Sequence, residues 1–251
     1  MNSKSNVVFM GTKEIGFSCL KHLVDCRDKF NYEVTGVLTN DRKFEENSMS
    51  VSDLAKMSNI PIIQNLDQFL QMDCVDLVIS VQYHEILKKV HLEKANRINV
   101  NLHMAPLPEY RGCNQFSFAI LNEDKEFGTS IHLMDDGIDS GDIISQSRFP
   151  IPKNCFVDEL YKLTVKESEN LFKGTLPNLI SGNIAPIPQN SFKSHRSELH
   201  YRKEINEIKE INPSWETQKL IRHIRATAMT GFPSPYMIID RKKIKFIVED
   251  K

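Results

Sequence analysis

Short apolar runs alternate with helical patterns along the first hundred residues. The runs that predict buried strands cover residues 6–10, 32–38, 75–81 and 97–102. After the first run, Ile15, Cys19, Leu20 and Leu23 recur at the spacing of one helix face, and residues 51–57 predict another helix. Strands that alternate with helices indicate right-handed βαβ units and a mostly parallel sheet. Such sheets bind their ligands beyond the carboxyl ends of the strands.

The pattern changes after Leu102. Residues 104–112 hold two prolines and a glycine and predict a loop. A helix is expected over residues 115–121 and strands over 127–134 and 142–149, and an amphipathic helix over 157–180 should be interrupted or ended near Pro177. We therefore predict an α/β fold, with a Rossmann-like, mostly parallel sheet and helices on both of its faces.

A change in composition at Pro186 indicates a second, smaller unit. The stretch PIPQNSFKSHRSELHYRKEI is polar, basic and broken by turns. A helix over residues 215–226, the turn GFPSPY and two strands over 237–239 and 244–247 should follow, with Arg241 and Lys242 in the turn between the strands. We expect a catalytic domain over residues 1–185 and a small C-terminal α+β subdomain with a β-hairpin over 186–251.

Composition and charge narrow the class of protein. The formal net charge of the 251 residues is -1, which indicates no general attraction to nucleic acid or to an anionic membrane. The five cysteines form no CxxC pair, so neither a disulfide framework nor a metal site is expected. No signal peptide or membrane-spanning run is present in the pattern. We expect a cytoplasmic enzyme with no nucleic-acid or membrane partner.

Three polar residues are candidates for acyl-transfer chemistry. Asn101 and His103 lie two apart at the end of a predicted strand, so their side chains point the same way. Asp139 lies in the glycine-flanked turn between two later strands. An amide can stabilise an oxyanion, an imidazole can transfer a proton, and a carboxylate can orient that imidazole.

The segment NLHMAPLPEYRGCNQFSFAILNEDKEFGTSIHLMDDGIDSGDII resembles the formyltransferase family. The family pattern is Asn-x-His after a strand, a loop with Leu-Pro and Arg-Gly, a second strand and then Asp-x-Gly. The likeness extends to the FMGT turn and to Ile-Arg-Ala at 224–226, although Met104-Ala105 replaces a common Ser-Leu. The resemblance implies that Asn101, His103 and Asp139 are catalytic, with Asn101 holding the oxyanion, and that 10-formyltetrahydrofolate is the formyl donor.

The resemblance also implies where the folate binds. Its pterin ring needs an apolar slot with hydrogen-bonding groups, and the slot should lie between residues 80–87 and the loop 134–139. The residues expected to bind the cofactor are Ser80, Gln82, Tyr83, Ile86, Met134, Asp136 and Gly137.

Three classes of enzyme within the family differ in the amine that accepts the formyl group. Glycinamide ribonucleotide enzymes resemble one another in a phosphate loop of small residues, whereas this chain has Gly11-Thr12-Lys13-Glu14. Methionyl-tRNA formyltransferases carry a larger C-terminal domain and need a basic surface for RNA. Sugar-nucleotide N-formyltransferases resemble this chain in length and in the tail SELHYRKEINEIKEINPSW. We therefore expect a dTDP-linked amino-dideoxy sugar as the acceptor.

A basic and aromatic cluster suits such a substrate, because arginine and lysine bind diphosphates and an aromatic ring can stack on a base. The residues expected to bind it are Gly11, Thr12, Met104, Pro106, Arg111, Gly112, His200, Tyr201, Arg202, Lys203, Arg225, Phe232, Pro233 and Tyr236. The chain most resembles dTDP-4-amino-4,6-dideoxyglucose formyltransferases, whose products enter surface polysaccharide (O-antigen) synthesis. A dTDP-3-amino-3,6-dideoxyhexose is the alternative.

A nucleotide-binding dehydrogenase is the alternative from another class of enzyme. It would need GxGxxG after the first strand, and here Lys13 replaces the middle glycine between Gly11 and Gly16. The chain is also expected to form a homodimer, since members of the family often do. Either the strands after Phe232 or the basic stretch near Ser191 would supply the pairing surface.

Overall fold

A computed structural model describes residues 4–40, 49–192 and 196–248, and its centre is a six-stranded sheet in the order β2-β1-β3-β4-β6-β7. Four neighbouring strands are parallel: β2 (Tyr32–Leu38), β1 (Ser5–Gly11), β3 (Leu77–Val81) and β4 (Ile98–His103). The antiparallel strands β6 (Glu126–Leu133) and β7 (Ile143–Pro150) extend the sheet beyond β4. The predicted α/β fold with a mostly parallel sheet is confirmed.

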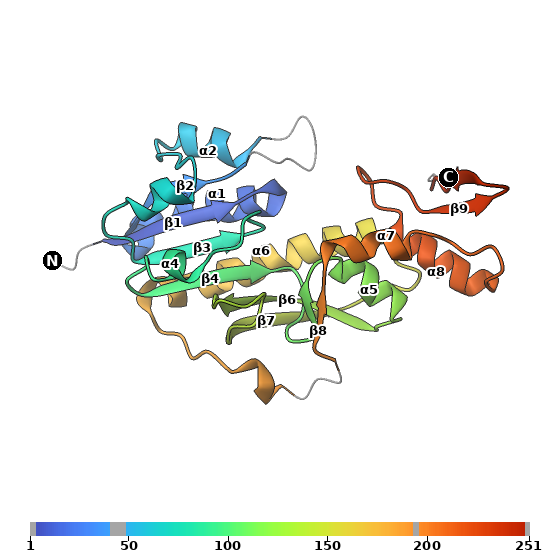
Figure 1. The fold of residues 1–251 in the computed structure, drawn as a ribbon. Coiled ribbons are helices and arrows are strands. Elements are labelled where there is room, and N and C mark those ends of the chain that lie inside the picture. The colour runs from blue at the N-terminus through green and yellow to red at the C-terminus, as the bar shows by residue number, and fades with distance from the viewer. Residues whose placement is uncertain (1–3, 41–48, 193–195, 249–251) are drawn as a thin grey trace.

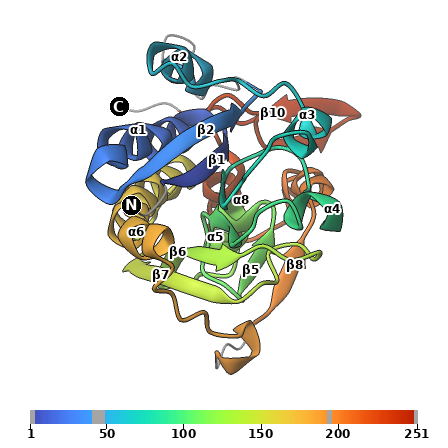
Figure 2. The same ribbon diagram turned by 90° about the vertical axis from the view of Figure 1, so that its left-hand side faces the viewer.

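Alternate residues of each central strand pack into different cores, because successive side chains of a strand point to opposite faces. Val7 and Phe9 of β1 join the large core, whereas Val8 and Met10 join a smaller one. The large core packs against α1 (Lys13–Phe30) and α6 (Val157–Ser181), and the smaller one against α3 (Leu66–Leu70). Viewed end-on, α1 and α6 lie on one side of the sheet, and α3 and α4 (Lys89–Leu92) on the other (Figure 2).

The predicted interruption of the long helix at Pro177 does not occur. Helix α6 continues to Ser181 and ends at Gly182, which has φ of 77°. A proline removes one backbone hydrogen bond and crowds the carbonyl four residues earlier. Leu176 and Leu179 are fully buried on either side of Pro177, so packing against the sheet holds the last turn in place.

The loop predicted over residues 104–112 ends in a strand. β5 (Tyr110–Gly112) pairs in parallel with β8 (Glu198–His200), a segment that the sequence indicated as broken by turns. Three-residue strands are too short to show a period of two, so only their tertiary pairing reveals them. The pairing joins the segment after Pro186 to the loop that follows His103. The division of the chain at residue 186 stays a prediction.

The C-terminal part consists of short elements around one helix. α7 (Ile205–Ile208) leads to α8 (Thr217–Thr227), which packs against α5 (Gln115–Leu121). The strands β9 (Tyr236–Ile239) and β10 (Lys242–Lys245) form a hairpin at the end of the molecule opposite the N-terminus (Figure 1).

The turn of this hairpin lies one residue earlier than predicted. It consists of Asp240 and Arg241, with φ of 48° and 63°, and Lys242 already belongs to β10. Two-residue turns with both φ values positive match the natural twist of hairpin strands. None of the described helices combines the length and apolarity needed to cross a bilayer.

Candidate active site

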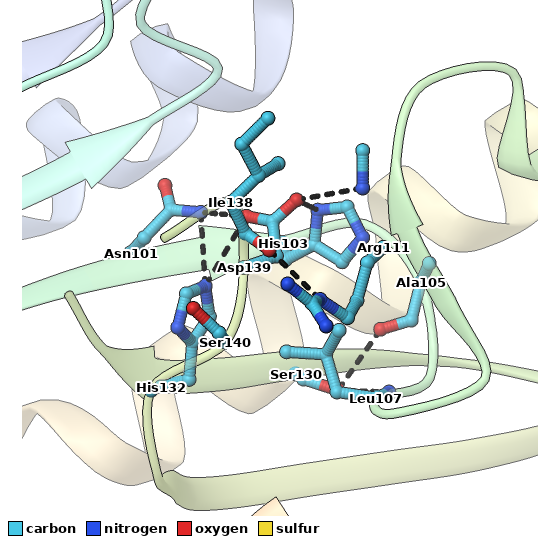
Figure 3. A network of polar contacts seen from close by, with 12 residues as sticks. Asn101, His103, Ala105, Leu107, Arg111, Ser130, His132, Ile138, Asp139 and Ser140 are labelled. Atoms are coloured by element: carbon cyan, nitrogen blue, oxygen red, sulfur yellow. Dashed lines mark hydrogen bonds and ion pairs between the residues drawn. The ribbon is translucent and has the colours of Figure 1, made fainter. Parts of the chain in front are cut away.

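Strand β4 delivers two of the predicted catalytic side chains. Asn101 and His103 lie on its last residues and on the same face, opposite His132 and Ser130 of β6 in the antiparallel register. His103 is 5% exposed, so its ring lies within the protein rather than on its surface. Asp139 comes from the loop between β6 and β7 and reaches back over the end of β4 (Figure 3).

The Asp139 carboxylate lies between two imidazoles. Its Oδ2 is 3.5 Å from His103 Nδ1, and its Oδ1 is 3.5 Å from His132 Nε2. The backbone N–H of Gly112 donates a hydrogen bond of 2.9 Å to Oδ2. Burial by itself raises the pKa of Asp139, but the charge of His103, the contact with His132 and the Gly112 N–H outweigh burial and hold that pKa well below its usual range. The carboxylate is therefore ionised at neutral pH.

The loop that carries Asp139 is fixed from both sides. Arg111 Nε donates to the Ile138 carbonyl at 2.8 Å, and Gln189 Nε2 donates to the Asp139 carbonyl at 2.8 Å. Asp139 itself has φ of 48°, a left-handed conformation that is uncommon outside glycine. Strained backbone of this kind persists where surrounding contacts enforce it, and it occurs often at active sites.

The imidazole of His103 has one defined tautomer. Its Nε2 lies 2.7 Å from the Tyr110 carbonyl oxygen, which can only accept, so Nε2 carries a proton. Nδ1 then faces the Asp139 carboxylate and is the atom that can gain or lose a proton there. A carboxylate next to an imidazole stabilises the imidazolium, which is the arrangement required of a proton-transfer pair.

His132 is a member of the site that the sequence analysis missed. It is 2% exposed, and its Nε2 lies 3.2 Å from Asn101 Nδ2. It lies in the strand predicted over residues 127–134, and the sequence analysis gave it no role. The antiparallel register of β4 and β6 places His132 opposite Asn101, and the spacing of residues in the sequence does not reveal this register.

A cavity of about 160 Å³ opens beside Asn101 and Asp139. Five of the residues predicted to bind folate line it, and Gln82 and Asp136 do not: the Gln82 amide oxygen instead accepts a hydrogen bond from Lys13 Nζ at 2.9 Å. The full lining is Ser80, Tyr83, Glu85, Ile86, Leu87, Leu92, Asn101, His132, Met134, Asp135, Gly137, Ile138 and Asp139. In the part of the chain that the structure describes, no cluster of three His, Cys, Asp or Glu side chains could hold a metal ion.

The residues predicted to bind the acceptor fall into two groups. Arg111 and Gly112 contact the Asp139 loop directly. Met104, Pro106 and Thr12 are buried, and the Thr12 hydroxyl donates to the Gln82 carbonyl, which ties the end of β1, with Gly11, to the end of β3. The part that these buried residues take in binding the acceptor stays a prediction.

The second group lies in the C-terminal part. The ring of His200 stacks on Phe118 with centroids 3.6 Å apart, and its two nitrogens face the carboxylates of Glu198 and Glu204. Tyr201 is exposed, and its carbonyl accepts a hydrogen bond from Asn114 beside β5. Arg202, Lys203, Phe232 and Pro233 are also exposed, Tyr236 is partly buried, and Arg225 donates to the Cys155 carbonyl. No member of this group lines the cavity, and their role in binding stays a prediction.

Gly112 links the two parts of the site, and its replacement tests that link. It has φ of 83°, and an added Cβ would lie 2.2 Å from the His200 carbonyl oxygen. We expect Gly112→Ala to separate β5 from β8, displace the N–H that binds Asp139 and lower the melting temperature, since strained conformations cost about 1–3 kcal/mol each. Differential scanning fluorimetry and turnover measure both effects.

Gly174→Ala is the matched control for this substitution. A Cβ at Gly174, within α6, would meet no atom within 4 Å, and alanine is favoured over glycine inside a helix. We expect this variant to be as stable as the parent or slightly more so. Equal stability of Gly112→Ala and Gly174→Ala would contradict the role given to Gly112.

Known proteins share both the sequence and the fold. The Formyl transferase family model matches residues 9–176. The methionyl-tRNA formyltransferase of Lactobacillus gasseri is 30% identical over 96% of this chain and 77% of its own length. That of Clostridium novyi is 32% identical over 75% of this chain and 63% of its own length.

Solved structures with this fold include sugar N-formyltransferases. The sugar 3N-formyl transferase WlaRD, determined in the presence of dTDP and 5-N-formyl-THF, superposes with a TM-score of 0.80 at 27% identity and covers 97% of this chain and 85% of its own. A 4-N formyltransferase from Francisella tularensis gives 0.78 at 19% identity, with 98% of each chain covered, and shows the fold alone. The family match spans more than half of the chain and contains the Asn101, His103 and Asp139 cluster, and from this we conclude that the protein belongs to the formyl transferase family and is a one-carbon transferase.

Proposed function

We propose that this enzyme transfers the formyl group of 10-formyltetrahydrofolate to the amine of a dTDP-linked amino-dideoxy sugar. The observation that carries the proposal is the meeting of Asn101, His103 and Asp139, of which Asn101 and Asp139 line a partly apolar cavity. The similarity to WlaRD over 97% of the chain supports a sugar nucleotide as the acceptor.

The cavity fits one end of a folate. Its volume of about 160 Å³ is below the roughly 300–1,000 Å³ typical of a site that encloses a whole ligand, so it suits the pterin ring, with the rest of the folate outside. Leu92 and Met134 supply apolar walls. Tyr83 and Ile86 line the same cavity, and Ser80 and Asn101 add polar groups to its wall.

The three catalytic residues have separable tasks in formyl transfer. A neutral amine attacks the formyl carbon, and the carbonyl oxygen becomes an oxyanion as the new C–N bond forms. An N–H of Asn101 is placed to donate to that oxygen. His103 Nδ1 accepts the proton that the attacking amine loses, and the ionised Asp139 holds the resulting imidazolium in place. The intermediate then collapses: the bond between the formyl carbon and N10 of the folate breaks, N10 takes up the proton, and tetrahydrofolate leaves.

A phosphorylated glycinamide fits the site less well than a sugar nucleotide. Glu14 lies in the first turn of α1, directly after Gly11-Thr12, and places a carboxylate at the helix end where a phosphate would bind. Methionyl-tRNA is the second candidate acceptor, because enzymes of that name are the curated relatives at 30–32% identity. The match covers 63–77% of those two enzymes, so part of their length has no counterpart in this chain.

The amine is proposed to lie at C-4 of a dTDP-4-amino-4,6-dideoxyglucose. The product would be a precursor for surface polysaccharide such as O-antigen, and the reaction would take place in the cytoplasm, in keeping with five unpaired cysteines. The 3-amino isomer is the alternative, and it is favoured by the similarity to WlaRD, a sugar 3N-formyl transferase.

The mass of the product decides among these acceptors. The enzyme is incubated with 10-formyltetrahydrofolate and, separately, dTDP-4-amino sugar, dTDP-3-amino sugar, methionyl-tRNA and glycinamide ribonucleotide. We expect one formyl group to be added to the 4-amino sugar. Formylation of methionyl-tRNA with neither sugar modified would overturn the proposed acceptor while leaving formyl transfer intact.

We further propose that the hairpin β9–β10 pairs with a second copy of the chain. Met237 lies opposite Ile244 in the register, so Met237, Ile239 and Ile244 share one face, and the two isoleucines are each 47% exposed. A two-stranded hairpin is at best marginally stable unless another surface covers it. The basic stretch near Ser191 is the other predicted surface, and part of it lies outside the described residues.

Two substitutions, each of which introduces a lysine on one face of the hairpin, test this surface. Ile244→Lys should convert a dimer to a monomer in light scattering after size exclusion, because a lysine would be buried without a partner in the interface. Ile238 points to the opposite face and is 44% exposed, so Ile238→Lys is the control and should remain a dimer. A monomeric parent protein, or two dimeric variants, would exclude this interface.

A further inference from the structure

We propose that His132 is a positioning residue, which holds the amide of Asn101 so that one of its N–H groups is directed at the reacting formyl oxygen. The inference rests on formyl transfer and is independent of which amine is the acceptor. His132 lies opposite Asn101 where β6 pairs with β4, and both side chains line the cavity. At 2% exposure, the ring of His132 is held by the surrounding protein.

The backbone fixes which nitrogen of His132 carries the proton. Nδ1 lies 2.7 Å from the Leu133 carbonyl oxygen, and a carbonyl can only accept, so Nδ1 is the protonated nitrogen. Nε2 of the neutral ring then has a lone pair, and it lies 3.2 Å from Asn101 Nδ2. The amide therefore donates one of its two N–H groups to His132.

The second N–H of Asn101 is held much less firmly. Among the described residues, its one other contact of this kind is a 3.4 Å approach to Asp139 Oδ1, which is at the long end for a hydrogen bond. An oxyanion forming in the cavity can compete for this N–H. The nitrogen and oxygen ends of a carboxamide have nearly the same shape, so an asparagine without a fixed partner can rotate and present its oxygen instead. An amide oxygen facing an oxyanion would repel it.

The same contacts give the two imidazoles different tasks. Each has a nitrogen 3.5 Å from the Asp139 carboxylate. Nε2 of His132 already accepts from Asn101, so a proton on that nitrogen would displace the amide. Within the described part of the chain, Nδ1 of His103 faces Asp139 alone, so the proton that pairs with the carboxylate belongs to His103. His103 transfers protons, and His132 stays neutral and acts through Asn101.

A double-mutant cycle tests this assignment. The variants are His132→Leu, Asn101→Ala and the pair, together with His132→Gln, whose amide oxygen can still accept from Asn101. We expect His132→Leu to lower kcat about tenfold or more, a share of the roughly 10²–10³ typical of a lost oxyanion donor, and to change KM for 10-formyltetrahydrofolate by less than about threefold. His132→Gln should recover most of the lost kcat.

The cycle separates positioning from a general structural effect. If His132 acts through the amide, His132→Leu has little further effect on kcat once Asn101 is alanine, because residues that act as a unit are not additive. An equal loss of kcat in both backgrounds, or a loss expressed mainly in KM, would overturn the proposal. His22→Gln, in α1 and outside the cavity, is the histidine control, and melting temperatures confirm that each variant is folded.

Discussion

Replacing Asn101 by alanine is expected to lower kcat by about 10²–10³-fold while KM for the folate changes little, because an oxyanion donor acts mainly in the transition state. The side chain lies at the cavity beside Asp139 and donates through Nδ2. Steady-state rates of tetrahydrofolate release, measured together with formation of the formylated acceptor, give kcat and KM.

Asn183→Ala is the matched control for the loss of an asparagine, since Asn183 is exposed beyond the end of α6. It should retain full activity. If kcat of Asn101→Ala falls by less than tenfold and the variant folds normally, another group stabilises the oxyanion.

Replacing Asp139 by asparagine is expected to have the largest effect, about 10³–10⁴-fold on kcat. The neutral amide cannot balance the imidazolium of His103, although its oxygen can still accept the Gly112 N–H and preserve the loop. The exposed Asp67→Asn in α3 is the control. Activity within tenfold of the parent would show that the carboxylate is not needed to hold His103.

The pH dependence of stability gives a second measurement on Asp139. Its pKa lies well below the usual range in the folded state, so its stabilising contribution is complete above the unfolded value of about 3.9 and is lost as pH falls through the folded value. The melting temperature of Asp139→Asn should therefore lie below that of the parent at neutral pH. The difference should shrink below about pH 4, and a constant difference down to pH 2 would contradict the lowered pKa.

Much of the fold could be predicted because its signals are local. The apolar run at Leu77–Val81 is buried on both faces, and burial on both faces produces continuous hydrophobicity. The helical spacing of Ile15, Cys19 and Leu23 similarly reports one face packed on the sheet. The predicted break at Pro177 failed because the propensity of one residue was outweighed by packing on both sides of it.

In the site, too, the features that depend on neighbouring residues could be predicted, and those that depend on strand pairing could not. Asn101 and His103 could be paired from the sequence, because residues two apart on a strand share a face. Asp139 was a candidate from its turn between two strands, and the resemblance to the formyltransferase family joined it to the other two residues. The sequence could not provide His132, whose task exists only because β6 lies antiparallel to β4 in one register.

The sequence by itself determined the alternation of strands and helices, which follows from the period of its hydrophobic residues. Its resemblance to the formyltransferase family supplied the class of reaction and the candidate catalytic residues. The tertiary structure decided the contacts between distant segments: β5 with β8, Gly112 with Asp139, and His132 with Asn101. The physical reason is that a hydrogen bond depends on distance and direction in space, which a chain acquires only when packing has fixed the register of its strands.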